Sequence, residues 1–189
     1  MIEIPESVTL AHQIDEAFSG KTVDSVQANQ TPRRFGLFHP DPEEYPLFLG
    51  GKTLPVARPN GVQIDLVFEV MHLVFNDGAT PRYLATDDAD PKKHQLLIRF
   101  EDGTGLYCTV RMYGGMMIYP NGKTDNEYYL VSRDKPSPLT DTFDRAYFQK
   151  IVDAAEPKLS AKALLATEQR IPGLGNGVLQ DILWNARIH

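Results

Sequence analysis

A glycine-rich turn near the end of the chain has the composition of an anion-binding site. It reads Ile171-Pro172-Gly173-Leu174-Gly175-Asn176-Gly177 and runs directly into an apolar-periodic stretch that predicts a helix from about Val178. Glycines let a backbone turn sharply and approach a ligand closely. The free amides at a helix start, with the helix dipole behind them, suit a phosphate. The candidate ligands are Asn176 and the amides of Gly175 and Gly177. A turn that only packs tightly explains the same residues, so both interpretations stay open.

The overall composition limits the classes of protein to which the chain can belong. Its 189 residues fit one domain or two small ones, and a hydrophobic fraction of 42% is ordinary for a globular protein. No stretch has the length of a membrane span and the first residues do not form a signal peptide, so we expect a cytoplasmic location. The net charge of −6 argues weakly against a nucleic-acid binder, although a local basic face stays possible.

The first two thirds of the chain predict a helix followed by antiparallel strands. Residues 5–19 read as a helix, with Pro5 in its first turn and Gly20 as its stop. Residues 21–30 predict a strand, and a proline-rich loop follows. Strands are then expected at 62–70, 72–75, 82–85, 95–100, 106–112 and 128–131. Turn signals at 76–78, 101–105 and 120–122 separate several of them. One covered face in this pattern implies a second layer, and therefore a β-sandwich with a helix attached.

The last third of the chain predicts helices. Ser132 to Pro138 has the composition of a linker, so we expect domains at 1–132 and 133–189. Thr140 or Asp141 can cap a helix that carries Phe143 and Ile151, and residues 158–165 predict a second short helix. The third helix follows the glycine-rich turn. Because the chain stops just past it, we expect a piece of a longer protein.

Two motifs in this order resemble the formamidopyrimidine-DNA glycosylase and endonuclease VIII family. The family begins Met-x-Glu-Leu-Pro-Glu, continues with a β-rich part, and has a helical part in which Gly-x-Gly-Asn opens a helix. The matching residues here are Met1-Ile2-Glu3-Ile4-Pro5-Glu6 and Ile171-Pro172-Gly173-Leu174-Gly175-Asn176. The last residues, 181–189, resemble the helix that follows the family's turn. The resemblance implies an α+β fold: an N-terminal β-sandwich with a leading helix, followed by an all-α helix-two-turn-helix domain.

The resemblance also implies a function in base-excision repair of DNA. Members of the family remove oxidised bases and then cut the backbone at the abasic site. Their nucleophile is an amino-terminal proline, whose amine attacks C1′ of the sugar and forms a Schiff base, while a neighbouring Glu handles protons. An α-amine has a pKa near 8, so a useful fraction of it is neutral at physiological pH.

The chain departs from this pattern at the nucleophile. Position two is Ile2, whereas Glu3 is retained as the proton-handling carboxylate. The primary amine of Ile2 can in principle form a Schiff base, but a bulky second residue normally hinders removal of Met1. The simpler interpretation of Ile2 is an apolar anchor. In addition, the hairpin 58–64 lacks the family's Gly-Lys, because Gly61 is followed by Val62.

Other family positions are present. Arg111-Met112-Tyr113-Gly114 corresponds to the family's Arg-Arg-Phe-Gly loop, which fills the gap left by the flipped base. Met112 and Tyr113 are candidate wedges and Arg111 a candidate phosphate or orphan-base contact; a core position for Met112 stays open. Lys93 and His94 resemble the family's Lys-His pair, which contacts the DNA backbone, with a solvated loop pair as the alternative.

No metal or cofactor is expected in this chain. The histidines lack metal-ligand spacing, and Cys108 is the single cysteine, which excludes a disulfide and a multi-cysteine zinc site within it. Zinc belongs to the family's zinc finger, which follows the helical unit and needs four cysteines. The expected partner is double-stranded DNA that contains a damaged base or an abasic site, bound by a monomer.

Two hypotheses follow from this pattern. The first is a damaged-DNA glycosylase and lyase in which Glu3 acts with an unusual amine nucleophile. The alternative is a noncatalytic binder of lesions or abasic sites that keeps the turn and the wedge. A ribosomal-type RNA-binding protein with a similar helical unit is a third possibility, against which the β-rich first part argues.

Overall fold

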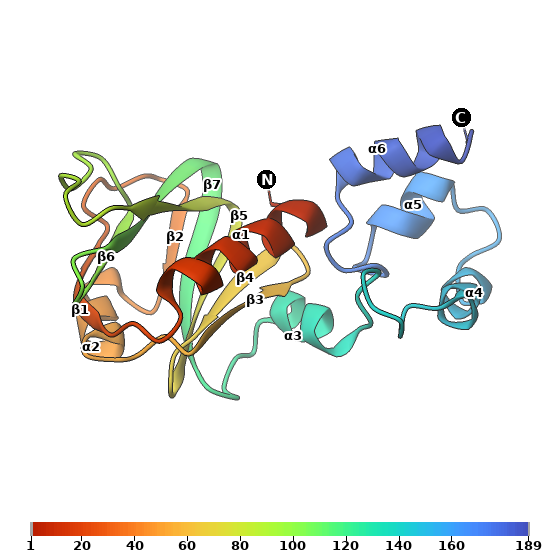
Figure 1. Cartoon of the computed structure of the whole chain (residues 1–189). Helices are drawn as coiled ribbons and strands as arrows, with labels where there is room; N and C mark the ends of the chain where they lie inside the picture. The colour runs from red at the N-terminus through yellow and green to blue at the C-terminus, as the bar shows by residue number, and fades with distance from the viewer. Residues whose placement is uncertain (1, 189) are drawn as a thin grey trace.

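The computed structural model describes residues 2–188 and has an α+β fold, as expected. A helix, α1 (Ile4–Phe18), lies along one seven-stranded sheet, and the remaining long helices follow at the other end of the molecule (Figure 1). The strands are β1 (Val23–Ala28), β2 (Gly36–His39), β3 (Val56–Asn60), β4 (Gln63–Val67), β5 (Met71–Leu84), β6 (Leu96–Phe100) and β7 (Gly105–Pro120). The helices after α1 are η1 (Pro42–Glu44), α2 (Tyr45–Leu49), α3 (Glu127–Asp134), α4 (Arg145–Asp153), α5 (Ala161–Ala166) and α6 (Asn176–Asn185).

Helix α1 forms where its sequence predicts it, within one residue at each end. Pro5 is in the first turn, and the Glu6 carboxylate accepts a hydrogen bond from the Glu3 amide at 3.0 Å, which satisfies a free donor at the helix start. Ala11, Ile14 and Phe18 are buried against the sheet. This apolar stripe sets the direction of α1 across β3 and β4, and so it fixes the place of the N-terminal residues.

The sheet is one continuous layer, and most of its buried residues belong to one hydrophobic cluster. Its order is β1-β6-β7-β5-β4-β3, with β2 added in parallel to β7, and the other pairs are antiparallel. The two longest strands, β5 and β7, pair along almost their whole length, with a register shift between Asp77 and Ala79. Residues on both sides of this shift, such as Phe75 and Cys108, belong to the same buried cluster. The two layers expected of a sandwich are therefore halves of one bent sheet.

Several local predictions were wrong. The strands expected at 72–75 and 82–85 are parts of one strand, β5, and the proline-rich loop contains β2, η1 and α2. Residues 76–78 do not reverse the chain, because Asp77 takes a φ of 55° and makes a bulge within β5. Residues 128–131, predicted as a strand, lie in α3: the Asn126 side chain caps this helix by accepting a hydrogen bond from the Tyr129 amide at 3.1 Å. The predictions for residues 76–78 and 128–131 failed because Asp77 and Asn126 can serve a turn, a bulge or a helix cap, and their hydrogen-bond partners decide which of these forms.

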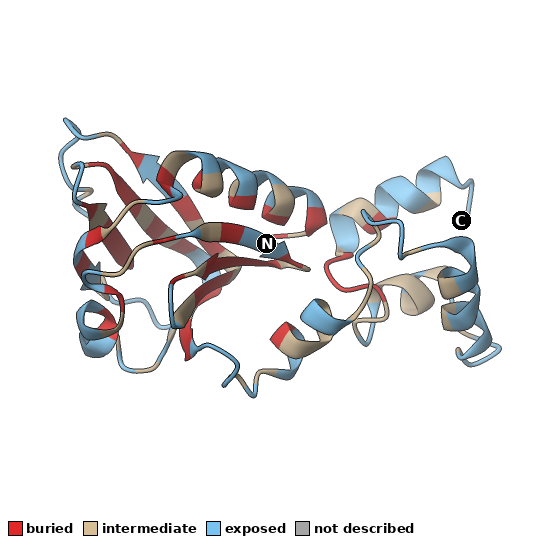
Figure 2. Ribbon diagram, turned by 60° about the horizontal axis from the view of Figure 1, so that its bottom comes forward, coloured by how far each residue is buried: buried red, intermediate tan, exposed pale blue. Residues whose placement is uncertain are grey.

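The first helix of the helical part, α3, begins at Glu127 and runs into the stretch that was expected to be a linker. The predicted boundary at 132/133 falls inside α3, and α4 is capped by Asp144 rather than by Thr140 or Asp141. Burial is concentrated in the sheet and on one face of α1, whereas α4 and α6 are largely exposed and α5 is mostly of intermediate burial (Figure 2). Among residues 2–188, no helix has the length and apolar character to cross a membrane.

Candidate nucleic-acid interface

The N-terminal segment, residues 2–4, joins the sheet to the glycine-rich turn. The Ile2 amide donates a hydrogen bond to the Asp77 carbonyl in the bulge of β5 at 2.8 Å. Two residues later, the Ile4 amide donates to the Gly173 carbonyl at 3.0 Å. Figure 1 shows the N-terminus between the sheet and the start of α6. The two motifs at opposite ends of the sequence therefore form one structural unit.

Glu3 binds the start of α6 with both carboxylate oxygens. Its Oε1 accepts a hydrogen bond from the Gly177 amide and its Oε2 one from the Val178 amide, each at 2.9 Å. These are two of the free amides that made the turn a candidate anion site. A Cβ on Gly175 would lie 2.5 Å from Glu3 Oε1, so the turn needs glycine there to admit the carboxylate. The anion that the turn holds in this structure is thus a side chain of the protein itself.

Asn176 remains open to a ligand. It is the first residue of α6 and is exposed, and its side chain has no hydrogen-bond partner among residues 2–188. It lies directly before Gly177, whose amide holds Glu3. A phosphate at Asn176 would therefore sit beside the Glu3 carboxylate.

The side chain of Ile2 is part of the hydrophobic core. It is 3% exposed and belongs to the cluster that contains Ile14 and Phe75. This position agrees with the interpretation of Ile2 as an apolar anchor. Burial of the side chain also fixes its backbone nitrogen next to Asp77 and Glu3, the place where the family's nucleophile is expected.

Arg111, Met112 and Tyr113 form an exposed tip in the middle of β7. Met112 is 82% exposed with a φ of 59°, and Tyr113 is 41% exposed. Met112 is therefore not a core residue, which removes the alternative considered for it. The tip lies over the bulge of β5, where a Cβ on Gly78 would lie 2.6 Å from the Tyr113 carbonyl oxygen. Through Asp77 and Ile2, the same bulge connects the tip to the N-terminal segment.

Lys93 and His94 are placed differently from each other. Lys93 is exposed, whereas His94 is 2% exposed and its Nδ1 lies 2.8 Å from the Pro91 carbonyl. Its Nε2 is a buried side-chain nitrogen without a partner among the described residues. A phosphate can reach Lys93 in this conformation but not the ring of His94.

Sequence reasoning missed Asp77, which it treated as a turn residue. Its backbone carbonyl binds Ile2, and burial raises the pKa of its carboxyl group above the ordinary value. Asp77 is thus a second carboxyl group beside the N-terminal segment, in addition to Glu3. The sequence Asn-Asp-Gly does not predict that Asp77 lies partly buried beside the N-terminal segment, because the same three residues are typical of a solvated turn.

The described residues do not form a metal site. Within residues 2–188, no group of three or more His, Cys, Asp or Glu side chains could hold a metal ion. Cys108 is buried in the core, and burial raises the pKa of its thiol. The four-cysteine zinc site of the family's finger does not fit the residues of this chain.

Comparison with known proteins identifies relatives of one kind. No family model matches the chain. The chain is 29% identical over 197 aligned positions to the formamidopyrimidine-DNA glycosylase of Lactococcus lactis subsp. cremoris, covering 100% of this chain and 68% of the relative. It is 25% identical to that of Streptococcus thermophilus over 192 positions, with the same coverage of both chains.

Solved structures of such proteins share the fold. The structure of Lactococcus lactis formamidopyrimidine-DNA glycosylase bound non-covalently to DNA with an abasic site matches with a TM-score of 0.79 and 26% identity. This match covers 99% of the present chain and 69% of the other. MutM in complex with DNA containing carbocyclic 8-oxo-G matches with a TM-score of 0.78 and 25% identity, over 99% and 70% of the two chains.

Proposed function

Because this chain is a homologue of the formamidopyrimidine-DNA glycosylases, we propose that it binds double-stranded DNA at an abasic site or an oxidised base. The observation that carries the proposal is the connection between the exposed Met112 tip and the Asn176 turn through residues 2–4. These contacts tie the bulge beneath the candidate wedge to the turn that carries the candidate phosphate-binding group.

The tip has the chemistry of a wedge. An apolar side chain inserted between bases limits the free-energy cost of extruding a nucleotide, which amounts to a few kcal/mol. Met112 is exposed and its backbone is held in a left-handed conformation by the bulge beneath it. Arg111 precedes it and Tyr113 follows it, so a cation and an aromatic ring flank the point of insertion.

The turn has the chemistry of a phosphate contact that does not depend on sequence. Asn176 offers a side-chain amide at the positive end of α6, while Glu3 fills the next two amide positions. We therefore expect one phosphate at Asn176, next to the amides that Glu3 occupies. Because phosphate contacts position the DNA and do not specify it, Asn176→Ala weakens binding to damaged and intact duplexes equally.

The binding test uses the full-length protein and two duplexes that differ in one position. Fluorescence anisotropy with a tetrahydrofuran abasic analogue and with an intact duplex gives the two dissociation constants at several salt concentrations. Tighter binding to the abasic duplex, with a shared loss in Asn176→Ala, supports the proposal. Equal binding of the two duplexes by the unchanged protein contradicts it.

A second candidate function is glycosylase and lyase activity through the amine of Ile2. The observation in its favour is that the buried Ile2 side chain fixes its nitrogen 2.8 Å from the Asp77 carbonyl and next to Glu3. After removal of Met1, the amine lone pair would bond to C1′ of the sugar as the glycosidic bond breaks and the base leaves. Ring opening then gives an imine, with Glu3 carrying the proton.

Borohydride trapping on DNA with a natural abasic site distinguishes the two candidates. Catalysis predicts a reduced covalent adduct at Ile2, located by mass spectrometry, and its loss in Glu3→Gln. Mass spectrometry of the intact N-terminus first shows whether Met1 is present. Tight binding to the abasic duplex with no adduct and with Met1 retained identifies a noncatalytic binder.

A further inference from the structure

A surface loop, residues 31–36, is fixed beside the Met112 tip. The loop reads Thr31-Pro32-Arg33-Arg34-Phe35-Gly36, and β2 begins at its last residue. β2 runs parallel to β7 with Gly36 opposite Gly114, and the Gly114 amide donates a hydrogen bond to the Phe35 carbonyl at 3.0 Å. The residues before these glycines are Phe35 and Tyr113. The register therefore pairs the final glycines of two Arg-x-aromatic-Gly sequences.

A buried glutamine holds the loop against β7. The Gln95 side chain is 3% exposed; its Nε2 donates to the Thr31 carbonyl and its Oε1 accepts from the Val110 amide, both at 2.7 Å. Val110 directly precedes Arg111, so one side-chain amide ties the start of the loop to the start of the tip. The Thr31 amide also donates to the His94 carbonyl at 3.0 Å. The loop is thus a positioned element with its ends anchored.

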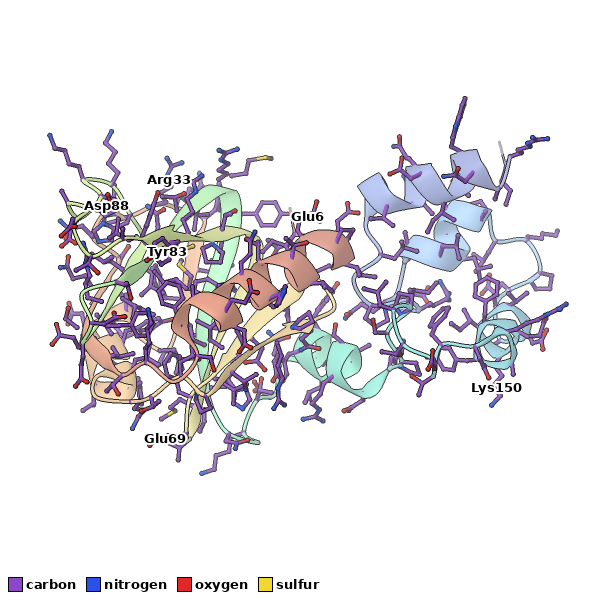
Figure 3. All side chains as sticks on the ribbon, viewed as in Figure 1. Glu6, Arg33, Glu69, Tyr83, Asp88 and Lys150 are labelled. Atoms are coloured by element: carbon purple, nitrogen blue, oxygen red, sulfur yellow. The ribbon has the colours of Figure 1, made fainter. Side chains whose placement is uncertain are left out.

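The loop presents cations and an aromatic ring to solvent. Arg33 and Arg34 are exposed and take part in no ion pair or hydrogen bond of their guanidinium groups among residues 2–188. Phe35 is 52% exposed, and the Arg34 guanidinium lies 5.1 Å from the centre of its ring. Figure 3 shows Arg33 extending from the edge of the sheet. Asp77 lies opposite Gly114 on the other side of β7, and burial raises the pKa of its carboxyl group.

These features match the backbone and bases of a distorted duplex. Unpaired guanidinium groups bind phosphates, and an exposed ring with an arginine above it stacks on a base. Arg33 and Arg34 on the loop and Arg111 at the tip are three exposed cations of a chain whose net charge is −6. An acidic protein that binds a polyanion needs such a local concentration of positive charge.

We propose that Arg33, Arg34 and Phe35 are a second DNA-contacting element that acts beside the wedge. The two arginines bind phosphates next to the lesion, and Phe35 packs against a base that the inserted Met112 has unstacked. This proposal rests on the DNA-binding function proposed above and adds to it the residues that supply charge and stacking at the tip.

The test separates the charge of the loop from its stacking. For Arg33→Ala/Arg34→Ala, the slope of log K against log salt becomes less steep by about 2, because each phosphate contact contributes about 0.9. For Phe35→Ala, the slope is unchanged and affinity for the abasic duplex falls about 5-fold or more, whereas Phe35→Tyr retains it. The control is Arg145→Ala/Lys150→Ala on α4, at the far end of the molecule (Figure 3), which removes the same charge.

The outcomes distinguish this proposal from the one on which it rests. If the unchanged protein binds abasic DNA and Asn176→Ala weakens binding, but the loop variants behave like the α4 control, the role of the loop is overturned and the function stands. If the unchanged protein shows no preference for abasic DNA, both are overturned. Thermal unfolding of each variant shows that the exposed substitutions leave the fold intact.

Discussion

The Glu3 carboxylate and the Gly177 amide are 2.9 Å apart, although 174 positions separate them in the sequence. Together with the Val178 amide, this contact makes Glu3 the cap of a helix in the other part of the molecule. The proton-handling candidate and the phosphate-binding candidate are therefore in direct contact. A change at either one is expected to affect the other.

Substitution of Glu3 tests how much this contact stabilises the protein. In Glu3→Gln, an amide group faces one of the two backbone donors, so one hydrogen bond to α6 is lost. We expect the free energy of unfolding to fall by about 1 to 3 kcal/mol, measured by urea denaturation. Glu69→Gln, an exposed carboxylate on a turn of the sheet, is the matched control and should be neutral. Equal stabilities of the two variants would contradict a structural role for Glu3.

A double-mutant cycle tests why Gly175 is glycine. Its φ of −97° and ψ of −174° are open to any residue, so the predicted cost of Gly175→Ala comes from its Cβ meeting the Glu3 carboxylate. The cost should therefore shrink in a Glu3→Ala background, with a coupling of about 0.5 to 3 kcal/mol. In Gly177→Ala the Cβ lies 3.2 Å from Glu3 Oε1, and the effect should be smaller. Strictly additive costs would refute the explanation.

Met112 should matter for recognition and not for stability. Because it is 82% exposed, Met112→Ala is expected to leave the melting temperature unchanged. The preference for abasic over intact duplex should fall about 10-fold, since an inserted wedge offsets a few kcal/mol of unstacking. Leu47 on α2 is 78% exposed and Leu47→Ala is the matched control. A similar preference in both variants would remove Met112 from the interface.

A polar cluster under α3 predicts a pH dependence of stability. His72 Nδ1 lies 2.9 and 3.0 Å from the two Asp65 carboxylate oxygens, and the Tyr129 hydroxyl donates to Asp65 Oδ2 at 2.7 Å. The hydrogen bond to Asp65 raises the pKa of His72 above its ordinary value, while partial burial and Arg58 oppose this shift. Arg133 of α3 and Asn121 also border the cluster.

The stabilisation from protonated His72 should be complete below about pH 6.5, the pKa of an unfolded histidine, and disappear as the pH rises through the higher folded pKa. Urea denaturation from pH 5.5 to 8.5 should therefore show the difference between the unchanged protein and His72→Gln becoming smaller at high pH. His12→Gln, on the exposed face of α1, serves as the control. A difference that is constant with pH would mean that His72 does not change its charge in this range.

The sequence predicted those parts of the fold that local pattern determines. Helix α1 and the hairpin of β6 and β7 follow from apolar periodicity and an Asp-Gly turn. The predictions of a turn at 76–78 and a strand at 128–131 were wrong. Asn, Asp and Gly occur in turns, bulges and helix caps alike, and the group to which each forms a hydrogen bond decides among these structures. For Asp77 that group is the backbone of Ile2, and for Asn126 it is the amide of Tyr129.

The candidate site could be predicted as a set of residues but not as an arrangement. Glu3 and the glycine-rich turn were each identified, yet their contact depends on how the helical part lies against α1. The contact between Phe35 and Gly114 depends on the parallel register of β2, a short strand that the sequence does not mark. Contacts between distant segments have no local pattern, so residue types could not reveal them.

The position of Glu3 has a consequence for the order in which the molecule folds. The amides that Glu3 caps belong to residues 177 and 178, which leave the ribosome long after Glu3 does. The sheet can close around its own core before that point, because its strands lie within residues 23–120. Contacts of such long sequence separation form late, after the entropy of a large loop has been lost. The surface that would bind DNA is therefore completed only after the sheet has formed.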